Sequence, residues 1–387
     1  MPTVRTPFTD TNIQRKVVSE QITLVGWSQA PLLKRLGWEN ERKWNFVNWP
    51  PGASKKIELL QDTVMPAADT LAKAITSTTA TTVEVTTPAY WQVGNVFKVG
   101  SEYMAVTDKA TSGVLTVQRG VGGSTAATHA AAAAMTRVTT AKTTGANYAI
   151  GYTTTMTLPY NYTQILETSV RVNRDQQIAG DYGVPDTMAY HLAKAIGGRS
   201  EVGQKGRAGS LTLDLARIAY HSLRQAPTET VAGIAGGLRT FITTNSYGGT
   251  STALSRATIH NAIRAVYEAG SMADVLVVSP YGAELINEMY EGSIRTERSE
   301  ERGGAVIKYI ETPNSEGEIE IVRDWMCPGT EMWLLDSEKV GWITVRPFTV
   351  EEKPSLGDYD VMSVLGEYSF IVADETAHAL IQHTAAS

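Results

Sequence analysis

The sequence predicts an α+β fold in which a strand near the C-terminus closes a sheet that begins much earlier in the chain. From Met362 to Val372 the residues alternate with a period of two, which is typical of a long half-buried strand. A second strand is predicted over Val345–Glu352, before a turn at Pro354–Gly357. From Leu238 onward, helical spacing supplies the α component. Because the long strand needs partners from earlier residues, the middle of the chain is predicted to be inserted between parts of one sheet.

Length and composition indicate a folded chain of two or three domains. The 387 residues are 42% hydrophobic and 19% charged, which is ordinary for a protein with a core. The net charge of −6 argues against a dedicated nucleic-acid-binding protein. A single cysteine, Cys327, excludes an internal disulfide framework. No run approaches the ~18 apolar residues of a membrane span, and residues 1–12 lack the apolar core of a signal peptide. We therefore expect a soluble, non-secreted protein without membrane contact.

Residues 1–54 are predicted to form an arm rather than a domain. Residues 1–43 contain seven Lys and Arg against four acidic residues, so this part is basic within an acidic protein. Trp38, Trp44 and Trp49 lie in an extended context that prolines interrupt. An extended segment cannot bury three tryptophans against itself, so they must pack on another surface. That surface is either the body of the same chain or a neighbouring subunit, and the sequence leaves both open.

Residues 75–138 are predicted to form a small all-β module. Thr and Val dominate there, and turn signals at Gly94, Gly100 and Gly113 separate the apolar runs. A compact insertion in a loop is well tolerated, since the penalty for loop closure grows slowly with length. Lys56–Leu60 and Met156–Val172 are expected to lead out to the module and back as strands. The predicted strands of the module are 82–85, 96–99, 103–107 and 114–117, followed by an Ala-rich loop at 126–134.

Helical spacing follows the module. Apolar residues recur at helical intervals over 188–196 and again over 211–223, and the Gly-rich stretch Gly197–Ser210 separates them. Two helices and one broken helix are both compatible with this pattern.

An α/β pattern with recognisable helix caps then begins. Ser255 is expected to cap a helix that Gly270 ends, and Asp274–Ser279 reads as a buried strand. Ser279 and Pro280 provide the cap and first turn of another helix.

No catalytic or cofactor-binding constellation is evident. The stretch Gly198–Lys205 has glutamine where a phosphate loop needs lysine, and the six histidines have no metal-ligand spacing. Ser279 lacks the elbow of a hydrolase nucleophile. Glu316, Glu318 and Glu320 alternate along an expected edge strand, where charges discourage aggregation. The sequence thus predicts a non-enzyme without cofactor or metal. The predicted arm, the two strands that lead to the β module and back, and the sheet that closes late in the chain favour a protein whose exposed edges are covered by neighbouring copies.

Several short motifs occur in a fixed order: arm, outgoing strand, β module, returning strand, helix, α/β body and closing strands. The motifs are Ile57–Pro66, Tyr160–Ile165, Val170–Val172, Gln176-Gln177, Arg346–Phe348, Gly366–Tyr368 and Ala377-His378, and in the insert Val93-Gly94, Gly100–Glu102 and Arg119–Gly123. In this order they resemble the major capsid proteins of tailed bacteriophages with the Hong-Kong-97-type fold. The insert is similar to a β module that recurs in phage capsid and tail proteins.

The resemblance implies pentamers and hexamers that close an icosahedral shell around packaged double-stranded DNA. It implies an arm at 1–54, an extended loop at 55–165 with the insertion 75–138, a peripheral domain with a spine helix at 166–240 and 340–387, and an axial domain at 241–339. Expected partners are portal and scaffolding or decoration proteins, and the expected location is the virion, assembled in the host bacterial cytoplasm. The candidate contacts between subunits are Trp38, Trp44, Trp49, Tyr160, Tyr162, Arg295 and Arg298, and the candidates facing DNA, without base readout, are Arg5, Arg15 and Lys16.

Two alternatives remain at this stage. A phage tail or decoration protein would share the β module, but it would leave the α/β body between Ser255 and Met289 unexplained. An enzyme with an accessory β module would need a catalytic constellation that the sequence does not display.

Overall fold

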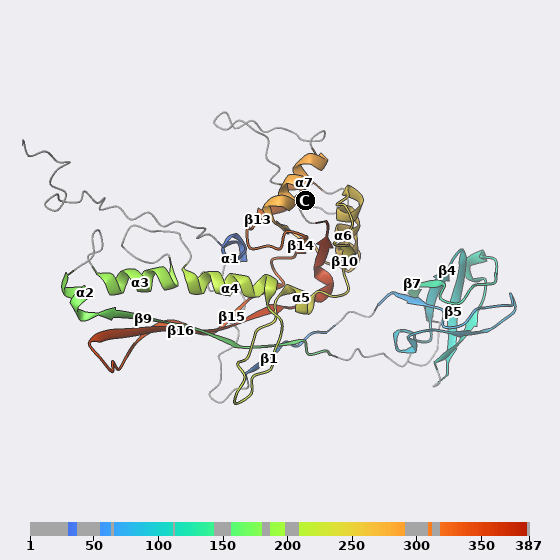
Figure 1. The fold of residues 1–387 in the computed structure, drawn as a ribbon. Coiled ribbons are helices and arrows are strands. Elements are labelled where there is room, and N and C mark those ends of the chain that lie inside the picture. The colour runs from blue at the N-terminus through green and yellow to red at the C-terminus, as the bar shows by residue number, and fades with distance from the viewer. Residues whose placement is uncertain are drawn as a thin grey trace, which may run out of the picture. The chain divides into compact units, whose positions relative to one another are not determined.

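The computed structural model describes residues 30–36, 55–62, 66–110, 113–142, 156–179, 186–197, 209–290, 309–311 and 318–384. The chain divides into two compact units (Figure 1). The first contains Met1–Leu59 and Pro159–Ser387, and the second contains Leu60–Leu158.

A six-stranded mixed sheet forms one half of the first unit. Its central strand β11 (Val275–Val278) is buried at all four positions. It runs parallel to β13 (Glu318–Arg323) and antiparallel to β14 (Glu331–Leu335). Leu276 and Val278 face a core shared with two helices, α6 (Arg256–Glu268) and α7 (Pro280–Tyr290), whereas Val275 and Val277 face the main core. The sheet is therefore covered on both faces, which explains the uninterrupted apolar run of β11. In sheet order the strands are β10 (Ser246–Gly248), β17 (Ala379–Gln382), β14 (Glu331–Leu335), β11 (Val275–Val278), β13 (Glu318–Arg323) and β12 (Tyr309–Glu311).

The predicted helix caps are confirmed. Ser255 Oγ accepts a hydrogen bond from the Thr258 amide at 3.1 Å, and Ser279 Oγ accepts one from the Gly282 amide at 3.0 Å. Gly270 follows α6 with φ +87°, a conformation that glycine adopts without strain. Local chemistry thus determines where both helices begin and where α6 ends.

A long three-stranded antiparallel sheet forms the other half of the first unit. It consists of β15 (Val340–Lys353), β16 (Tyr359–Val372) and β9 (Gln164–Asn173), with β16 in the centre. This confirms the long C-terminal strand and its pairing with a much earlier segment. Met156–Val172 is not one strand, however. β8 (Tyr160–Tyr162) and β9 are separated at Thr163, where the chain changes partner from β1 (Lys56–Glu58) to β16.

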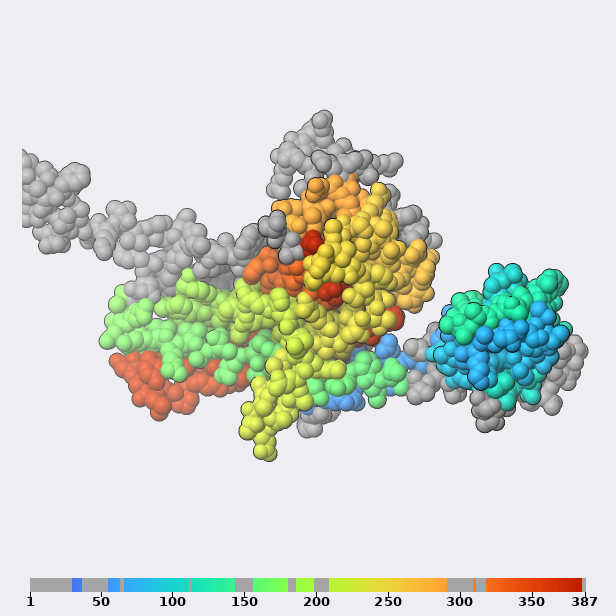
Figure 2. Space-filling model, turned by 45° about the vertical axis from the view of Figure 1, so that its right-hand side comes forward, coloured from blue at the N-terminus to red at the C-terminus, as the bar shows by residue number. Residues whose placement is uncertain are grey.

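Two helices lie along this sheet, as Figures 1 and 2 show. They are α3 (Thr187–Ile196) and α4 (Ser210–His221), and Gly197 ends α3 with φ +89°. Leu211 and Leu215 of α4 contribute to the main core with Tyr368 and Phe370 of β16. Whether α3 and α4 belong to one continuous spine helix depends on residues 198–208, which lie outside the described residues. The described part of this unit also contains the short helices α1 (Pro31–Leu36), α2 (Arg174–Ala179) and α5 (Leu238–Phe241).

The prediction that Glu316, Glu318 and Glu320 lie on an edge strand is wrong. β13 pairs on one side with β11 and on the other with β12, so β12 is the edge. β12 has only three residues, too few for a readable alternation. Glu320 is half-buried and accepts a hydrogen bond from Arg35, whereas Glu316 lies outside the described residues.

The second unit is a six-stranded antiparallel barrel. The strand order is β2 (Ala68–Thr70), β7 (Ala134–Thr140), β4 (Asn95–Val99), β5 (Glu102–Lys109), β6 (Val114–Gln118) and β3 (Thr82–Glu84). A bridge between Leu71 and Val85, with flanking backbone hydrogen bonds, joins β3 to β2 and closes the barrel. Within the described residues every strand therefore has two neighbours, and no sheet edge is free. The predicted strands at 82–85, 96–99, 103–107 and 114–117 are confirmed, and β2 and β7 were missed.

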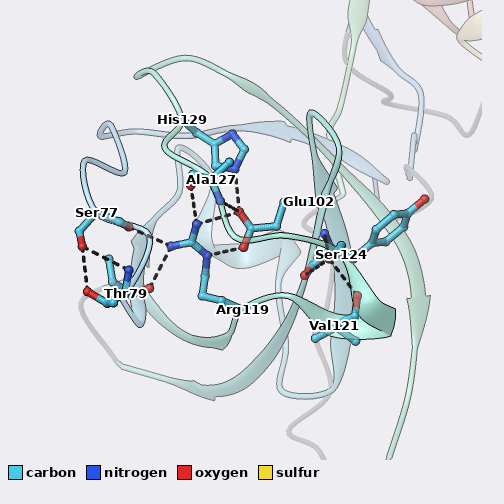
Figure 3. Close-up of polar contacts among 10 residues, drawn as sticks. Ser77, Thr79, Glu102, Arg119, Val121, Ser124, Ala127 and His129 are labelled. Carbon is cyan, nitrogen blue, oxygen red and sulfur yellow. Dashed lines mark hydrogen bonds and ion pairs between the residues drawn. The ribbon is translucent and has the colours of Figure 1, made fainter.

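A buried ion cluster organises the loops of the barrel (Figure 3). Glu102 has a fully buried side chain and accepts from Arg119, from the Ala127 amide at 3.0 Å and from His129 Nε2 at 2.9 Å. The other guanidinium hydrogens of Arg119 go to the carbonyls of Ser77, Ala80 and Ala127. Burial alone would raise the pKa of Glu102, but Arg119 and the other donors outweigh it and lower this pKa to about 2.

We predict that Glu102→Gln destabilises the barrel by about 3 kcal/mol or more, because a buried charge that loses its partner is costly. The matched control is Glu84→Gln, which removes the exposed ion pair with Lys73 in the same barrel and costs less than about 1 kcal/mol. Hydrogen exchange of the β5 and β6 amides in the full-length chain measures the loss of stability in both variants. Equal losses in the two variants would contradict a stabilising role of Glu102 in the buried ion cluster.

The two sheets of the first unit are joined by two neighbouring turns, residues 336–339 and 373–378, which we call the joint. The first leads from β14 to β15, and the second leads from β16 to β17. The Ala373 amide donates to the Lys339 carbonyl at 2.8 Å, and Lys339 Nζ donates to Asp374 at 2.9 Å. The Asp336 amide donates to Nδ1 of the fully buried His378 at 3.2 Å. The joint is therefore held mainly by polar contacts.

We predict that His378 makes the first unit acid-sensitive. Burial lowers the pKa of His378 to about 4, while Asp374 raises it and Lys339 lowers it. The unfolded chain, with an ordinary histidine pKa of about 6.5, binds the proton more readily, so stability falls as the pH drops from about 6.5 towards 4.

Urea unfolding between about pH 7 and pH 5 measures this dependence. In His378→Asn, whose amide oxygen can still accept from the Asp336 amide, the slope should flatten by up to ~1.4 kcal/mol per pH unit. His191→Asn, on the exposed side of α3, is the control. Parallel slopes in wild type and His378→Asn would refute the assignment.

Candidate assembly surface

A two-stranded ribbon begins on the long sheet of the first unit. β1 and β8 pair antiparallel, with Lys56 opposite Tyr162 and Glu58 opposite Tyr160. Ile57 of β1 packs in a small core with Ile343 and Ile371 of the underlying sheet. Apolar contact thus fixes the ribbon of β1 and β8 to the long sheet of the first unit.

Asn161 fastens the ribbon from its buried face. Its Nδ2 donates to the carbonyls of Gly236 and Phe370, and its Oδ1 accepts from the amides of Gly236 and Tyr162 at 2.8 and 2.9 Å. The side chain is fully buried and uses both amide hydrogens and both oxygen lone pairs. One amide therefore connects β8, β16 and the segment that follows α4.

Glu367 provides a charged anchor beside it. Its side chain is only 2% exposed and accepts hydrogen bonds from Lys55, just before β1, and from Arg346 of β15 at 3.0 Å. Burial alone would raise the pKa of Glu367, but the hydrogen bond and charge of Lys55, with help from Arg346, lower it. Glu367 stays ionised and holds the outgoing limb.

The two described contact candidates, Tyr160 and Tyr162, lie on this ribbon and are half-buried. The ring of Tyr160 contacts two cations, Lys56 Nζ at 4.2 Å and the Arg224 guanidinium at 4.0 Å from its centroid. Tyr162 packs edge-to-face on it, with ring centroids 5.7 Å apart. Much of the binding capacity of Tyr160 is therefore used inside its own chain.

Exposed apolar side chains continue along the limbs in the second unit. Gln61 pairs with Thr157 antiparallel, so Leu60 lies opposite Leu158. Leu60 is 71% exposed, Leu158 51% and the nearby Met156 54%. We include this continuation, residues 60–61 and 156–158, in the ribbon. Large aliphatic side chains exposed to water are typical of a contact surface.

Two further exposed apolar sites lie on the first unit. At one end of the long sheet, Leu356 in the β15–β16 turn is 97% exposed and Ile178 of α2 is 85% exposed. Arg174 at the start of α2 pairs with Asp358 and Asp360 across that end. Elsewhere the segment 223–235, yellow-green in Figure 2, projects from the body and exposes Leu223 and Val231.

The other candidates lie outside the described residues and stay predictions: Trp38, Trp44, Trp49, Arg295, Arg298, Arg5, Arg15 and Lys16. Asn161 and Glu367 were not recognised as anchors from the sequence, although both stand in motifs named above. The alternation carried no signal for either residue, because it places Glu367 on the mixed face of its strand and Asn161 on the face opposite Tyr160 and Tyr162.

Nothing in the described part of the chain has the geometry of a catalytic or metal site. No group of three or more His, Cys, Asp or Glu side chains converges on a metal position there. Cys327 is buried, and burial raises the pKa of its thiol, so it is a poor nucleophile. None of the described helices is both long and apolar enough to cross a membrane.

Comparison with known proteins decides the family. The family model of the SU10 major capsid protein matches residues 5–385. The chain belongs to this family. It is therefore a major capsid protein, a structural protein of a viral shell and not an enzyme. A search of curated protein sequences gave no significant match.

Solved structures agree on the fold. A cyanophage A-1(L) capsid chain is 13% identical, with a TM-score of 0.51 and coverage of 98% of this chain and 99% of that one. A chain of Mycobacterium phage Ogopogo is 12% identical, with a TM-score of 0.50 and coverage of 99% and 100%. The predicted α+β capsid fold of the Hong-Kong-97 type is confirmed. A family match over almost the whole chain also sets aside the tail, decoration and enzyme alternatives.

We predict that Asn161→Ala lowers the free energy of unfolding of the capsid protein by about 3 kcal/mol. The substitution leaves the buried amide and carbonyl of Gly236 without partners, at roughly 1–3 kcal/mol for each group. Asn261→Ala, at an exposed position of α6, should stay within about 0.5 kcal/mol of wild type. Chemical denaturation of both variants measures the difference, and similar midpoints would show that Asn161 is not an anchor.

Proposed function

We propose that copies of this capsid protein associate as pentamers and hexamers and close an icosahedral shell around packaged double-stranded DNA. The observation that carries the proposal is the family match over residues 5–385. The exposed apolar residues of the ribbon and of the body support it, because large aliphatic side chains in water gain stability when a neighbouring copy covers them.

In this proposal the parts of the chain have separate roles. Residues 1–54 are the arm, and 55–165 are the extended loop with the insertion 75–138. The peripheral domain comprises 166–240 and 340–387, and the axial domain comprises 241–339. Trp38, Trp44 and Trp49 then pack on neighbouring copies, together with the ribbon tyrosines, Arg295 and Arg298. The closed barrel spans residues 68–140 and so extends beyond the insertion 75–138 at both ends. It is a decoration of the loop and adds no sheet edge that could pair at random.

Contact with DNA is proposed to be electrostatic and independent of sequence. The net charge of −6 opposes binding by the whole surface, whereas Arg5, Arg15 and Lys16 give the arm a local positive charge. Portal and scaffolding or decoration proteins are the further partners that such a shell requires, and assembly takes place in the cytoplasm of the bacterial host.

We predict that the purified full-length protein forms closed shells or capsomers in negative-stain images and sediments accordingly. A strictly monomeric particle at high concentration would overturn the proposal.

We further predict that Leu158→Asp lowers the assembly yield severalfold without unfolding the chain, because it places a charge on the apolar ribbon. Leu158→Met keeps the apolar surface and should assemble like wild type. Circular dichroism confirms folding in each variant. Normal assembly of Leu158→Asp would show that the ribbon is not part of the interface between copies.

A further inference from the structure

The short helix α1 is held in place entirely by its surroundings. It has six residues, far below the length at which an isolated helix is stable in water. Leu32 and Leu33 are each 1% exposed and belong to the main core with Leu215 and Tyr220. α1 is therefore a part of the arm that completes the core of the body.

A buried carboxylate receives the start of α1. Asp324 follows β13 and is fully buried. Its Oδ2 accepts from the Leu32 amide at 3.4 Å and from the Tyr220 hydroxyl at 3.0 Å, and its Oδ1 accepts from the Met326 amide at 2.9 Å. The seat of α1 is thus built by α4 and by the turn after β13.

The other end of α1 contacts the joint through one shared side chain. Arg35 donates to Glu320 at 2.6 Å and to Asp274 Oδ2 at 3.1 Å. The same Asp274 carboxylate accepts from the amide of Ser337 at 2.7 Å and from its hydroxyl at 2.6 Å. Ser337 lies in the 336–339 turn of the joint, so Asp274 is bonded to α1 and to the joint at once.

We propose that α1 is a strap whose seating controls the joint between the two sheets of the body. When the strap is seated, Arg35 neutralises Asp274 and fixes the carboxylate that holds Ser337. When the strap leaves, Asp274 is free to reorient and the 336–339 turn loosens. A partner copy that acts on the arm would thereby change the freedom of the two sheets relative to each other.

The test is hydrogen exchange in the full-length chain, read at the amides of Ser337, Lys339 and Ala373. Leu33→Ala weakens the seating, Arg35→Ala removes the contact with Asp274, and Asp274→Asn keeps an acceptor for Ser337 while abolishing the ion pair. Each should accelerate exchange at the joint about fivefold or more, the lower end of typical coupling between sites. Lys34→Ala, at the exposed neighbouring position of the same helix, is the matched control and should leave exchange unchanged.

The amides of β11 provide the internal reference. They should accelerate less than the joint amides in Leu33→Ala, which also removes a side chain from the main core, and stay near wild-type rates in the other three variants. The proposal is overturned if Leu33→Ala and Arg35→Ala leave the joint amides within twofold of wild type. It is also overturned if β11 accelerates as much as the joint, since that would be global destabilisation.

Discussion

The architecture of the capsid protein depends on how the chain leaves the body and returns to it beside the same strand. About a hundred residues separate Leu59 from Pro159, yet β1 and β8 must lie in register on the long sheet. Apolar packing of Ile57 holds the ribbon but does not specify its register, because a slipped strand could bury another aliphatic side chain. Asn161 removes that freedom, since its four hydrogen bonds fit only one position.

The two units use buried charge in the same way for different purposes. In the barrel, Glu102 and Arg119 have no water to replace a lost partner, so they fix two loops, 72–81 and 119–133, in one arrangement. In the body, Glu367 is equally buried, but its partners Lys55 and Arg346 are about half exposed. The first cluster acts as an interior clamp, whereas the second can exchange its partners with solvent more easily.

Features with a short-range cause were predictable from the sequence. The existence of the long strand β16, the caps Ser255 and Ser279 and the stop at Gly270 all follow from neighbouring residues, and the structure reproduces them. The predicted half-buried alternation of β16 is not reproduced, because every position from Gly366 to Val372 is buried. β7 was missed because an Ala-rich stretch precedes it, and β13 was misplaced because its edge neighbour β12 is so short. The anchors were missed for another reason. Asn161 meets Phe370 across 209 residues of sequence, and no local pattern encodes such a partner.

The distribution of exposed apolar residues separates folding from assembly. Among the described residues, each unit has a hydrophobic core built from its own chain, and the barrel is closed. Leu60, Leu158, Leu356 and Ile178 nevertheless remain in water on a turn, a short helix and a ribbon, and none of them contributes to a core of its own chain. Such residues add nothing to the stability of a monomer. In the shell proposed above, another copy covers these residues, and association then depends on the concentration of the protein.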